Sequence, residues 1–213
     1  MLAIFIYCQS YMSTAGKLQV DTKWSVNFFF ESYDRQNNDG LNNLRFCPAC
    51  GNQCIQKEQS LRIRPSCPNC GFIHYRNPYP GVVVLIEQDG QVLLGKRTTG
   101  SFLAGKWCLP GGFIEFEEDF ISSAVREVKE ETNLDIEVES IFNVSSNFLS
   151  PDLHTLVVTL VATVSGGVPK PGDDIEALGW FQISAELPDM AFPADTYIIK
   201  HYNDFKPNAL PVT

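Results

Sequence analysis

Runs of apolar residues separated by turn signals are clearest in the second half of the chain. Residues 82–86 form a continuous apolar, mostly β-branched run, and residues 92–94 form a second one. The Asp89-Gly90 pair between them is a typical hairpin turn. Further strand-like stretches contain Ile136 and Val138, then Ile141 and Val144, then the runs 156–164 and 180–183. The pattern predicts a mixed sheet with buried strands.

Two segments instead repeat their apolar residues at helical spacing. The first spans about residues 118–131, and its Ile121, Val125 and Val128 are expected to face the sheet. The second spans about residues 194–205. Because helices that alternate with strands cover the faces of a sheet, the predicted fold class is α/β.

Composition divides the chain into three zones. Residues 1–43 form an N-terminal extension and linker, in which both Met1 and Met12 are candidate starts. Residues 44–77 form a cysteine-rich module, and residues 78–213 form the α/β domain. No apolar run approaches the roughly 18 residues of a membrane span, and the first residues lack the basic region of a signal peptide. A cytoplasmic protein is therefore expected.

Overall charge limits the choice of partners. The formal net charge is -9 and the pI is near 4.8, so the chain lacks the basic footprint with which proteins hold phosphate backbones. Residues 46–76 also lack a dense basic and aromatic face. Neither a nucleic-acid partner nor a membrane is expected. A polyphosphate ligand would require a bound cation or a few well-placed basic residues.

Four of the seven cysteines form two C-x-x-C pairs with sixteen residues between them, a spacing typical of a tetrahedral zinc site. Each pair is followed by a glycine, Gly51 or Gly71, where a positive φ would turn backbone N–H groups toward the thiolates. Cys54 and His74 are interpreted as bystanders, and disulfides or free thiols are the alternative to zinc. Four thiolates leave no open position for water, so the zinc is expected to be structural. The predicted zinc ligands are Cys47, Cys50, Cys67 and Cys70.

A cluster of glutamates follows a Gly-Gly turn. On a helix, Glu127, Glu130 and Glu131 occupy positions i, i+3 and i+4, so their carboxylates project within reach of a common centre. Such pairs repel by roughly a few tenths of a kcal/mol, and a bound cation removes the repulsion. Hard oxygen donors suit Mg²⁺ or Mn²⁺. Gly111 and Gly112 permit a tight loop whose backbone approaches a metal or phosphate. A solvated acidic helix face is the alternative.

These residues resemble the Nudix box. The matching positions are Gly112, Glu118, Arg126, Glu127, Glu130, Glu131 and Leu134. Asn133 departs from the usual glycine, and asparagine tolerates the left-handed conformation better than most residues. Together with the paired cysteines, residues 46–205 are similar to the zinc-ribbon branch of Nudix hydrolases. The resemblance implies a Nudix α/β/α sandwich with a mixed sheet, preceded by a small four-cysteine zinc ribbon, and it suggests a homodimer.

The same resemblance implies cleavage of a pyrophosphate linkage, since this branch includes NADH, ADP-ribose and FAD pyrophosphatases. NADH-type members carry a Ser-Gln-Pro-Trp run downstream of the box, whereas this chain reads Ser-Ser-Asn-Phe from Ser145. ADP-ribose-type members tend to have a proline near the position of Pro151. An ADP-ribose-like substrate is therefore favoured, with FAD and NADH as alternatives.

The resemblance also suggests a role for each site residue. Glu127, Glu130 and Glu131 are expected to hold Mg²⁺ while water attacks in line. Glu127 is one candidate for the base. Asp174 and Glu176 lie in a later loop that could supply another metal ligand or the base, and Glu176 is favoured as an auxiliary ligand. The remaining assignments are Arg126 as orienter of a carboxylate, Arg97, Gly111 and Gly112 as substrate contacts, and Glu118 as support for the start of the helix or for the loop amides.

Two other functions fit the residues less well. A house-cleaning nucleoside triphosphate pyrophosphohydrolase would keep the reaction and change the substrate. A non-catalytic nucleotide-sensing or nucleotide-binding module would keep the fold without turnover, and the intact glutamate set argues against it.

Overall fold

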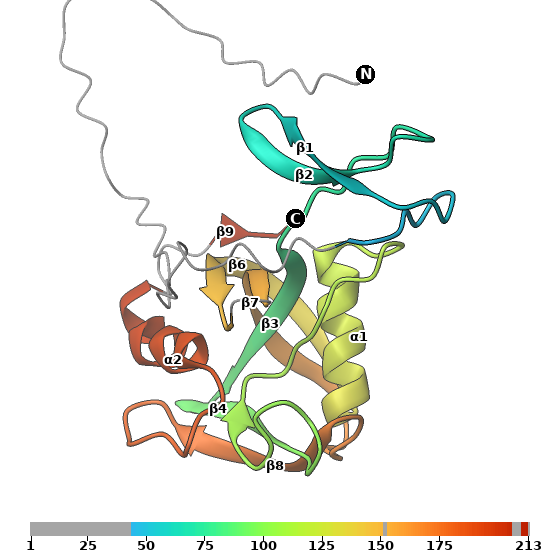
Figure 1. The fold of residues 1–213 in the computed structure, drawn as a ribbon. Coiled ribbons are helices and arrows are strands. Elements are labelled where there is room, and N and C mark those ends of the chain that lie inside the picture. The colour runs from blue at the N-terminus through green and yellow to red at the C-terminus, as the bar shows by residue number, and fades with distance from the viewer. Residues whose placement is uncertain (1–43, 151–152, 206–209, 213) are drawn as a thin grey trace, which may run out of the picture.

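The computed structural model describes residues 44–150, 153–205 and 210–212. The predicted extension over residues 1–43 and the proline at position 151 lie outside these residues. The described chain forms a small two-stranded sheet, made of β1 (Ile55–Gln59) and β2 (Arg62–Ser66), and a larger unit with seven strands and two helices (Figure 1). No helix in the described ranges is long and apolar enough to cross a bilayer.

The larger sheet is mixed, as the sequence predicted. Its strands are β3 (Tyr79–Gln88), β4 (Gln91–Arg97), β5 (Trp107–Cys108), β6 (Leu134–Phe148), β7 (His154–Gly167), β8 (Ile175–Gln182) and β9 (Leu210–Pro211). They follow the order β5-β4-β3-β7-β6-β9, and β8 pairs with β4. The β3–β7 pair is parallel, and the other pairs are antiparallel.

Strands β3 and β4 separate soon after the turn that joins them. Asp89 and Gly90 have φ values of 51° and 76°, which suit a two-residue hairpin turn, but β3 and β4 pair at only two positions beside it. Further along β3, the loop after β5 takes the place of β4. There Val82 N–H donates to the Gly112 carbonyl at 2.9 Å and Val84 N–H donates to the Pro110 carbonyl at 2.8 Å. The Gly-Gly turn is thereby fixed along the middle of the fold.

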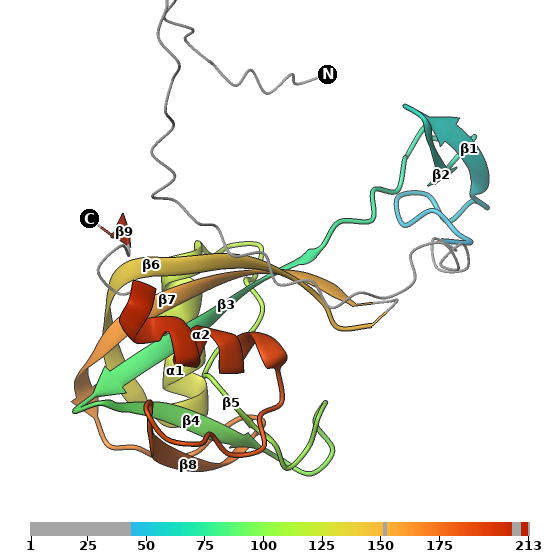
Figure 2. The same cartoon turned by 90° about the vertical axis from the view of Figure 1, so that its left-hand side faces the viewer.

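The two helices, α1 (Phe120–Thr132) and α2 (Pro193–Phe205), pack on opposite faces of the sheet (Figures 1 and 2). Alternate residues of β3 divide between them. Val82, Val84 and Ile86 belong to the α1 core, whereas Leu85 belongs to the α2 core with Ile198 and Tyr202. Burial on both faces explains why this strand is apolar throughout rather than alternating. The predicted α/β/α sandwich is confirmed.

The face by which α1 contacts the sheet differs in part from the predicted one. Val128 is fully buried as predicted, but Val125 is 39% exposed and Ala124 is fully buried instead. The small side chain of Ala124 lets the helix lie close to the strands. As a result Glu127 and Glu131 lie on the buried side of α1 and not on a separate solvent face.

Both ends of α1 have specific caps. The side chain of Asp119 accepts from the N–H groups of Ile121 and Ser122, each at 2.8 Å. At the other end, Asn133 has φ 59° and its N–H donates to the Lys129 carbonyl. The Asn133 side-chain amide also donates to the Val168 carbonyl at 2.9 Å. Asparagine thus preserves the left-handed turn for which a glycine would ordinarily be used.

Replacing Asn133 should separate the backbone requirement from the side-chain bond. Asn133→Val forces a β-branched residue into the left-handed region and should lower the free energy of unfolding by about 1–3 kcal/mol. Asn133→Gly loses only the amide bond and should stay within about 1 kcal/mol of the wild type. Denaturant unfolding of both variants measures the difference, and equal losses would contradict the cap.

Candidate functional site

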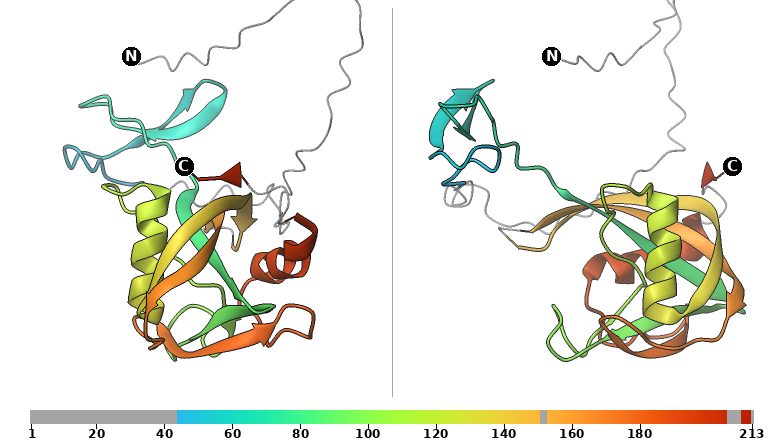
Figure 3. Two further views of the ribbon diagram at one scale, coloured as in Figure 1. Left: turned by 180° about the vertical axis from the view of Figure 1, so that it is seen from behind. Right: turned by 90° about the vertical axis from the view of Figure 1, so that its right-hand side faces the viewer.

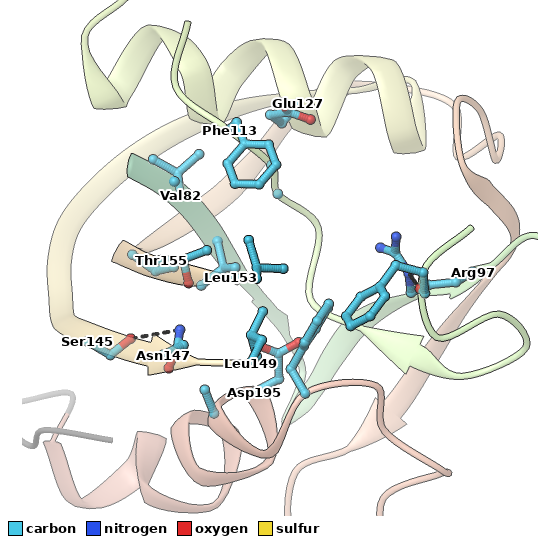
Figure 4. A pocket seen from close by; sticks show the side chains of 18 of the residues that line it. Val82, Arg97, Phe113, Glu127, Ser145, Asn147, Leu149, Leu153, Thr155 and Asp195 are labelled. Carbon is cyan, nitrogen blue, oxygen red and sulfur yellow. Dashed lines mark hydrogen bonds between the residues drawn. The ribbon is translucent and has the colours of Figure 1, made fainter. Parts of the chain in front are cut away.

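A pocket of about 390 Å³ lies where β3 and β4 separate, so residues from both helices reach it (Figure 4). Figure 4 shows Glu127 of α1 at one end and Asp195 of α2 at the other, with Ser145 and Asn147 of β6 on one side and Arg97 opposite. Its wall further includes Gly81, Gly111, Gly112, Phe113, Glu131, Thr155, Asp173, Asp174 and the aromatic rings of Phe102, Phe148 and Phe192. The pocket therefore combines acidic groups, backbone and apolar surface.

Two glycines bring the backbone directly against the acidic end of this pocket. A side chain at Gly112 would overlap the carboxylate of Glu127, and one at Gly111, where φ is 149°, would overlap the carbonyl of Val82. The Gly111 N–H donates to Glu131 Oε2 at 2.9 Å. Both predicted glycines are therefore required by close approach, and the loop leaves no space for a larger residue between β3 and α1.

Arg126 binds three carboxylates at once. Its Nε and Nη2 donate to the two oxygens of Glu118 at 2.6 and 2.8 Å, and Nη1 donates to Glu127 at 2.8 Å and Glu130 at 3.0 Å. These hydrogen bonds lower the pKa of Glu118. Glu118 also accepts the Glu115 N–H at 3.3 Å. It therefore contacts a loop amide, but the helix itself is capped by Asp119.

Burial separates the three glutamates of the predicted ligand set. Glu127 and Glu131 are 9% and 3% exposed and line the pocket, whereas the side chain of Glu130 is 51% exposed and meets Arg126 outside it. Burial raises the pKa of both pocket glutamates, to about 8 for Glu131. Within the described ranges, the compact group of three or more potential metal ligands is the cysteine set. The structure thus brings two of the three glutamates to the pocket.

The other predicted site residues are divided between the pocket and the surface. Arg97 lies on the pocket wall, where its Nη2 donates to Asp174 Oδ2 at 2.6 Å and its Nε donates to the Phe102 carbonyl. Glu176 does not reach the pocket. It is the second residue of β8, after Ile175, and forms an ion pair with Lys96 at 2.8 Å. The same loop instead contributes Asp173 and Asp174 to the wall.

Several polar residues of the pocket were not predicted from the sequence, among them Asp195 and Thr155. Asp195 is 2% exposed in the first turn of α2 and accepts the Leu109 N–H at 3.0 Å, and its burial raises its pKa to about 7. Thr155 is 5% exposed, and its Oγ1 has no hydrogen-bond partner in the described structure. Neither lies near the box in sequence, and an aspartate opening a helix ordinarily indicates a cap. The rings of Phe102 and Phe148 also line the pocket.

The four predicted zinc ligands come together in the small module. Their sulfur atoms lie within 4.8 Å of one another, with Cys47 and Cys70, and likewise Cys50 and Cys67, separated by 3.5 Å. Four sulfurs bound at about 2.3 Å to one tetrahedral centre would lie about 3.8 Å apart. Gly51 and Gly71 have the predicted positive φ values, 73° and 79°. All four cysteines are free of disulfides, and Cys54 and His74 lie outside the set.

The sandwich, with its glycine loop beside the glutamate helix, defines a Nudix-type fold. A NUDIX domain model matches residues 76–202, and the chain belongs to this family. Among solved structures, a NUDIX hydrolase from Nitrosomonas europaea aligns with a TM-score of 0.67 and 30% identity, over 79% of this chain and 96% of that one. A MutT NUDIX hydrolase from Burkholderia pseudomallei aligns with a TM-score of 0.53 and 29% identity, over 59% and 98% of the chains.

Curated relatives carry two kinds of name. An ADP-ribose pyrophosphatase of Methanocaldococcus jannaschii is 38% identical over 62% of this chain and 77% of its own length. The NAD-capped RNA hydrolase NudC of Pseudomonas aeruginosa is 33% identical over 75% of this chain. The alignment spans 54% of that relative, so this chain matches about half of it. The second name conflicts in part with the expectation that no nucleic acid is a partner.

The buried carboxyl of Asp195 should make stability depend on pH. Because its pKa is raised from 3.8 to about 7 in the folded state, its stabilising contribution is complete below about pH 4 and is lost as the pH rises through 7. Asp195→Asn should therefore gain roughly 2–4 kcal/mol relative to wild type between pH 4 and pH 8. Urea unfolding across this range measures it, and parallel pH profiles would contradict the assignment.

Proposed function

We propose that this protein hydrolyses the pyrophosphate bond of a nucleoside diphosphate derivative, with an ADP-ribose-like substrate favoured and FAD or NADH as further candidates. The observation that carries the proposal is the convergence of Gly111, Gly112, Glu127 and Glu131 at one end of a pocket with apolar walls. The acidic end suits a cation-bridged diphosphate, and the apolar remainder suits the rest of a nucleotide.

The metal ligands proposed are Glu127 and Glu131, which line the pocket, and Glu130, which shares Arg126 Nη1 with Glu127 outside it. Their hard carboxylate oxygens fit Mg²⁺ or Mn²⁺, and the burial that raises the pKa of Glu131 is offset when a cation lies beside the carboxylate. A bound ion would neutralise charge on the diphosphate and make water a stronger nucleophile. Arg126 holds Glu127 in position, and the Gly111 N–H does the same for Glu131.

A carboxylate at the pocket must accept the proton of the attacking water. Glu127 is one candidate. The loop before β8 supplies Asp174, whose Oδ2 binds Arg97 while Oδ1 has no partner among the described residues. Asp173 lies on the same wall. Both aspartates are better placed than Glu176, which is bound to Lys96 at the protein surface. We therefore assign the auxiliary acidic role to Asp174.

The choice of substrate rests on the shared chemistry of the relatives. ADP-ribose and NAD both contain an adenosine joined through a diphosphate to a second ribose, and the two groups of relatives are named for these molecules. Arg97 and Asp174 form a fixed polar pair on the wall, and Phe102, Phe148 and Phe192 offer rings for stacking. A house-cleaning triphosphatase or a nucleotide sensor would share the fold and differ in turnover.

Turnover of separate substrates tests this proposal. Purified protein with Mg²⁺ is incubated with ADP-ribose, NADH, FAD, diadenosine polyphosphates or nucleoside triphosphates, and products are resolved by chromatography. Glu127→Gln and Glu131→Gln should each lower kcat at least about a hundredfold on the preferred substrate. Glu137→Gln, an exposed residue of β6, is the matched control and should keep full activity.

Three results would sink the proposal. Hydrolysis of none of the substrates would favour a sensor. Preference for triphosphates would favour the house-cleaning reaction. Full activity of both glutamine variants would place the chemistry elsewhere.

The four cysteines are proposed to bind one structural Zn²⁺. Cys67→Ser removes a buried ligand, so the zinc content should fall below one ion per chain. The module should also become sensitive to proteolysis. Cys54→Ser, outside the ligand set, is the control and should retain zinc. Metal analysis of the purified proteins measures both, and equal zinc contents would contradict the assignment.

A further inference from the structure

Charge is distributed very unevenly along this acidic chain. Residues 44–77 contain five cationic side chains and one anionic side chain, a net charge of +4, which leaves -13 for the rest of a chain whose total is -9. The prediction that nucleic acid is not a partner was based on the total charge of the chain. A small basic module attached to an acidic domain provides a local positive surface that the total conceals.

The pairing of β1 with β2 gathers three of these five cations on one face. Lys57 lies opposite Arg64, and Gln59 lies opposite Arg62. Because side chains alternate along a strand, Lys57, Arg62 and Arg64 share one side of the hairpin, while Glu58 projects from the other side. Like charges directly opposite each other destabilise a strand pair unless an anion lies against them. The register therefore creates a basic face with no acidic side chain of the hairpin on it.

Exposed aromatic rings connect this face to the pocket. The Arg64 guanidinium lies over the ring of Tyr75, 4.7 Å from its centroid. The rings of Tyr79 and Phe113 lie 5.9 Å apart, and Phe113 is part of the pocket wall. Tyr75, Tyr79 and Phe113 are 56%, 56% and 51% exposed. Cations interleaved with exposed rings are the usual surface for single-stranded nucleic acid, since bases stack on the rings while cations contact phosphates.

The separation between face and pocket is short. Five residues separate Tyr75 from Gly81, which lines the pocket, so the Cα atoms of these two residues lie at most about 22 Å apart. Figures 2 and 3 show this segment as an extended connection between the hairpin and β3. A strand of a few nucleotides leaving the pocket past Phe113 and Tyr79 could reach the hairpin.

We propose that the hairpin face formed by Lys57, Arg62, Arg64 and Tyr75 binds a single-stranded RNA chain whose 5′-terminal nucleotide diphosphate occupies the pocket. This proposal rests on the proposed function, because the pocket must accept the terminal diphosphate. Lys57, Arg62 and Arg64 contact phosphates, and Tyr75, Tyr79 and Phe113 stack bases. The ribbon thus makes RNA-linked substrates bind more tightly than the corresponding free dinucleotide.

Binding without turnover tests the face by itself. Fluorescence anisotropy with an uncapped, labelled single-stranded oligoribonucleotide is measured over a series of salt concentrations. Lys57→Gln/Arg62→Gln should lower the affinity roughly tenfold at about 0.1 M salt and reduce the slope of log K against log salt by about 1.4. The control, Lys170→Gln/Lys200→Gln, removes the same charge from exposed positions elsewhere and should bind as wild type does. Equal zinc contents show that the ribbon of each variant is intact.

Turnover measurements test whether RNA that binds the face also places its 5′ end in the pocket. With wild type, KM for an oligoribonucleotide that carries a 5′-terminal NAD should lie below KM for free NAD. Lys57→Gln/Arg62→Gln should raise the first KM roughly tenfold and leave the second unchanged, with the same kcat for both substrates. A lower kcat with both substrates would instead indicate damage to the pocket and would overturn the proposal.

The two proposals fail in different ways. If no nucleotide is hydrolysed but RNA binding is lost in Lys57→Gln/Arg62→Gln, the proposed function fails and the RNA face stands. If ADP-ribose is hydrolysed but both double variants bind RNA equally, the face is wrong and the proposed function stands. Tighter binding of polyglutamate than of RNA to the wild-type face would assign it to an acidic protein segment and would also overturn the inference.

Discussion

The close approach of backbone to carboxylate at Gly111 and Gly112 determines how the rest of the site is assembled. The loop must lie beside β3, where it supplies the carbonyls of Pro110 and Gly112, and also beneath α1, where it meets Glu127 and Glu131. A side chain on either glycine would overlap its neighbours. Because β4 leaves β3 after two paired positions, the loop can take its place and the pocket opens beside it.

The burial of acidic groups is the main cost of this arrangement. Glu127, Glu131 and Asp195 all lose water on folding, and burial raises the pKa of each. Arg126 offsets part of this for Glu127, and single backbone N–H groups do so for Glu131 and Asp195. Acidic side chains that stay incompletely neutralised are typical of sites that bind a cation or move a proton.

The small cysteine module has a different physical character. It buries little apolar surface, since Ile55, Leu61 and Ile63 are at least half exposed, so its order depends on the cysteine cluster and not on a core. This leaves its hairpin surface free to carry charge. Basic residues are concentrated in the module and acidic residues in the sandwich. This separation agrees with the proposed roles, in which the module binds a chain of phosphates and the sandwich binds the diphosphate to be cleaved.

Local spacing was sufficient for much of this protein. The strands, the Asp89-Gly90 turn, the paired cysteines and the glutamate helix each follow from residues close together in sequence, where geometry is set by the backbone period and by turn conformation. Even Asn133 could be interpreted from its own tolerance of positive φ, and the structure confirms the turn. The family followed from the same short-range spacing.

Contacts between distant segments required the tertiary structure. Glu127 and Glu131 could not be separated from Glu130 until the close packing of Ala124 showed which side of α1 is buried. Asp195 and Thr155 reach the pocket only because α2 and β7 meet β3 there, and Glu176 fails to reach it because it binds Lys96 on β4. The basic face likewise depends on strand register, since a one-residue shift would place Lys57 opposite Ile63 or Pro65 and not Arg64. Spacing along the chain determined the elements and their chemistry, whereas packing decided which side chains share a surface.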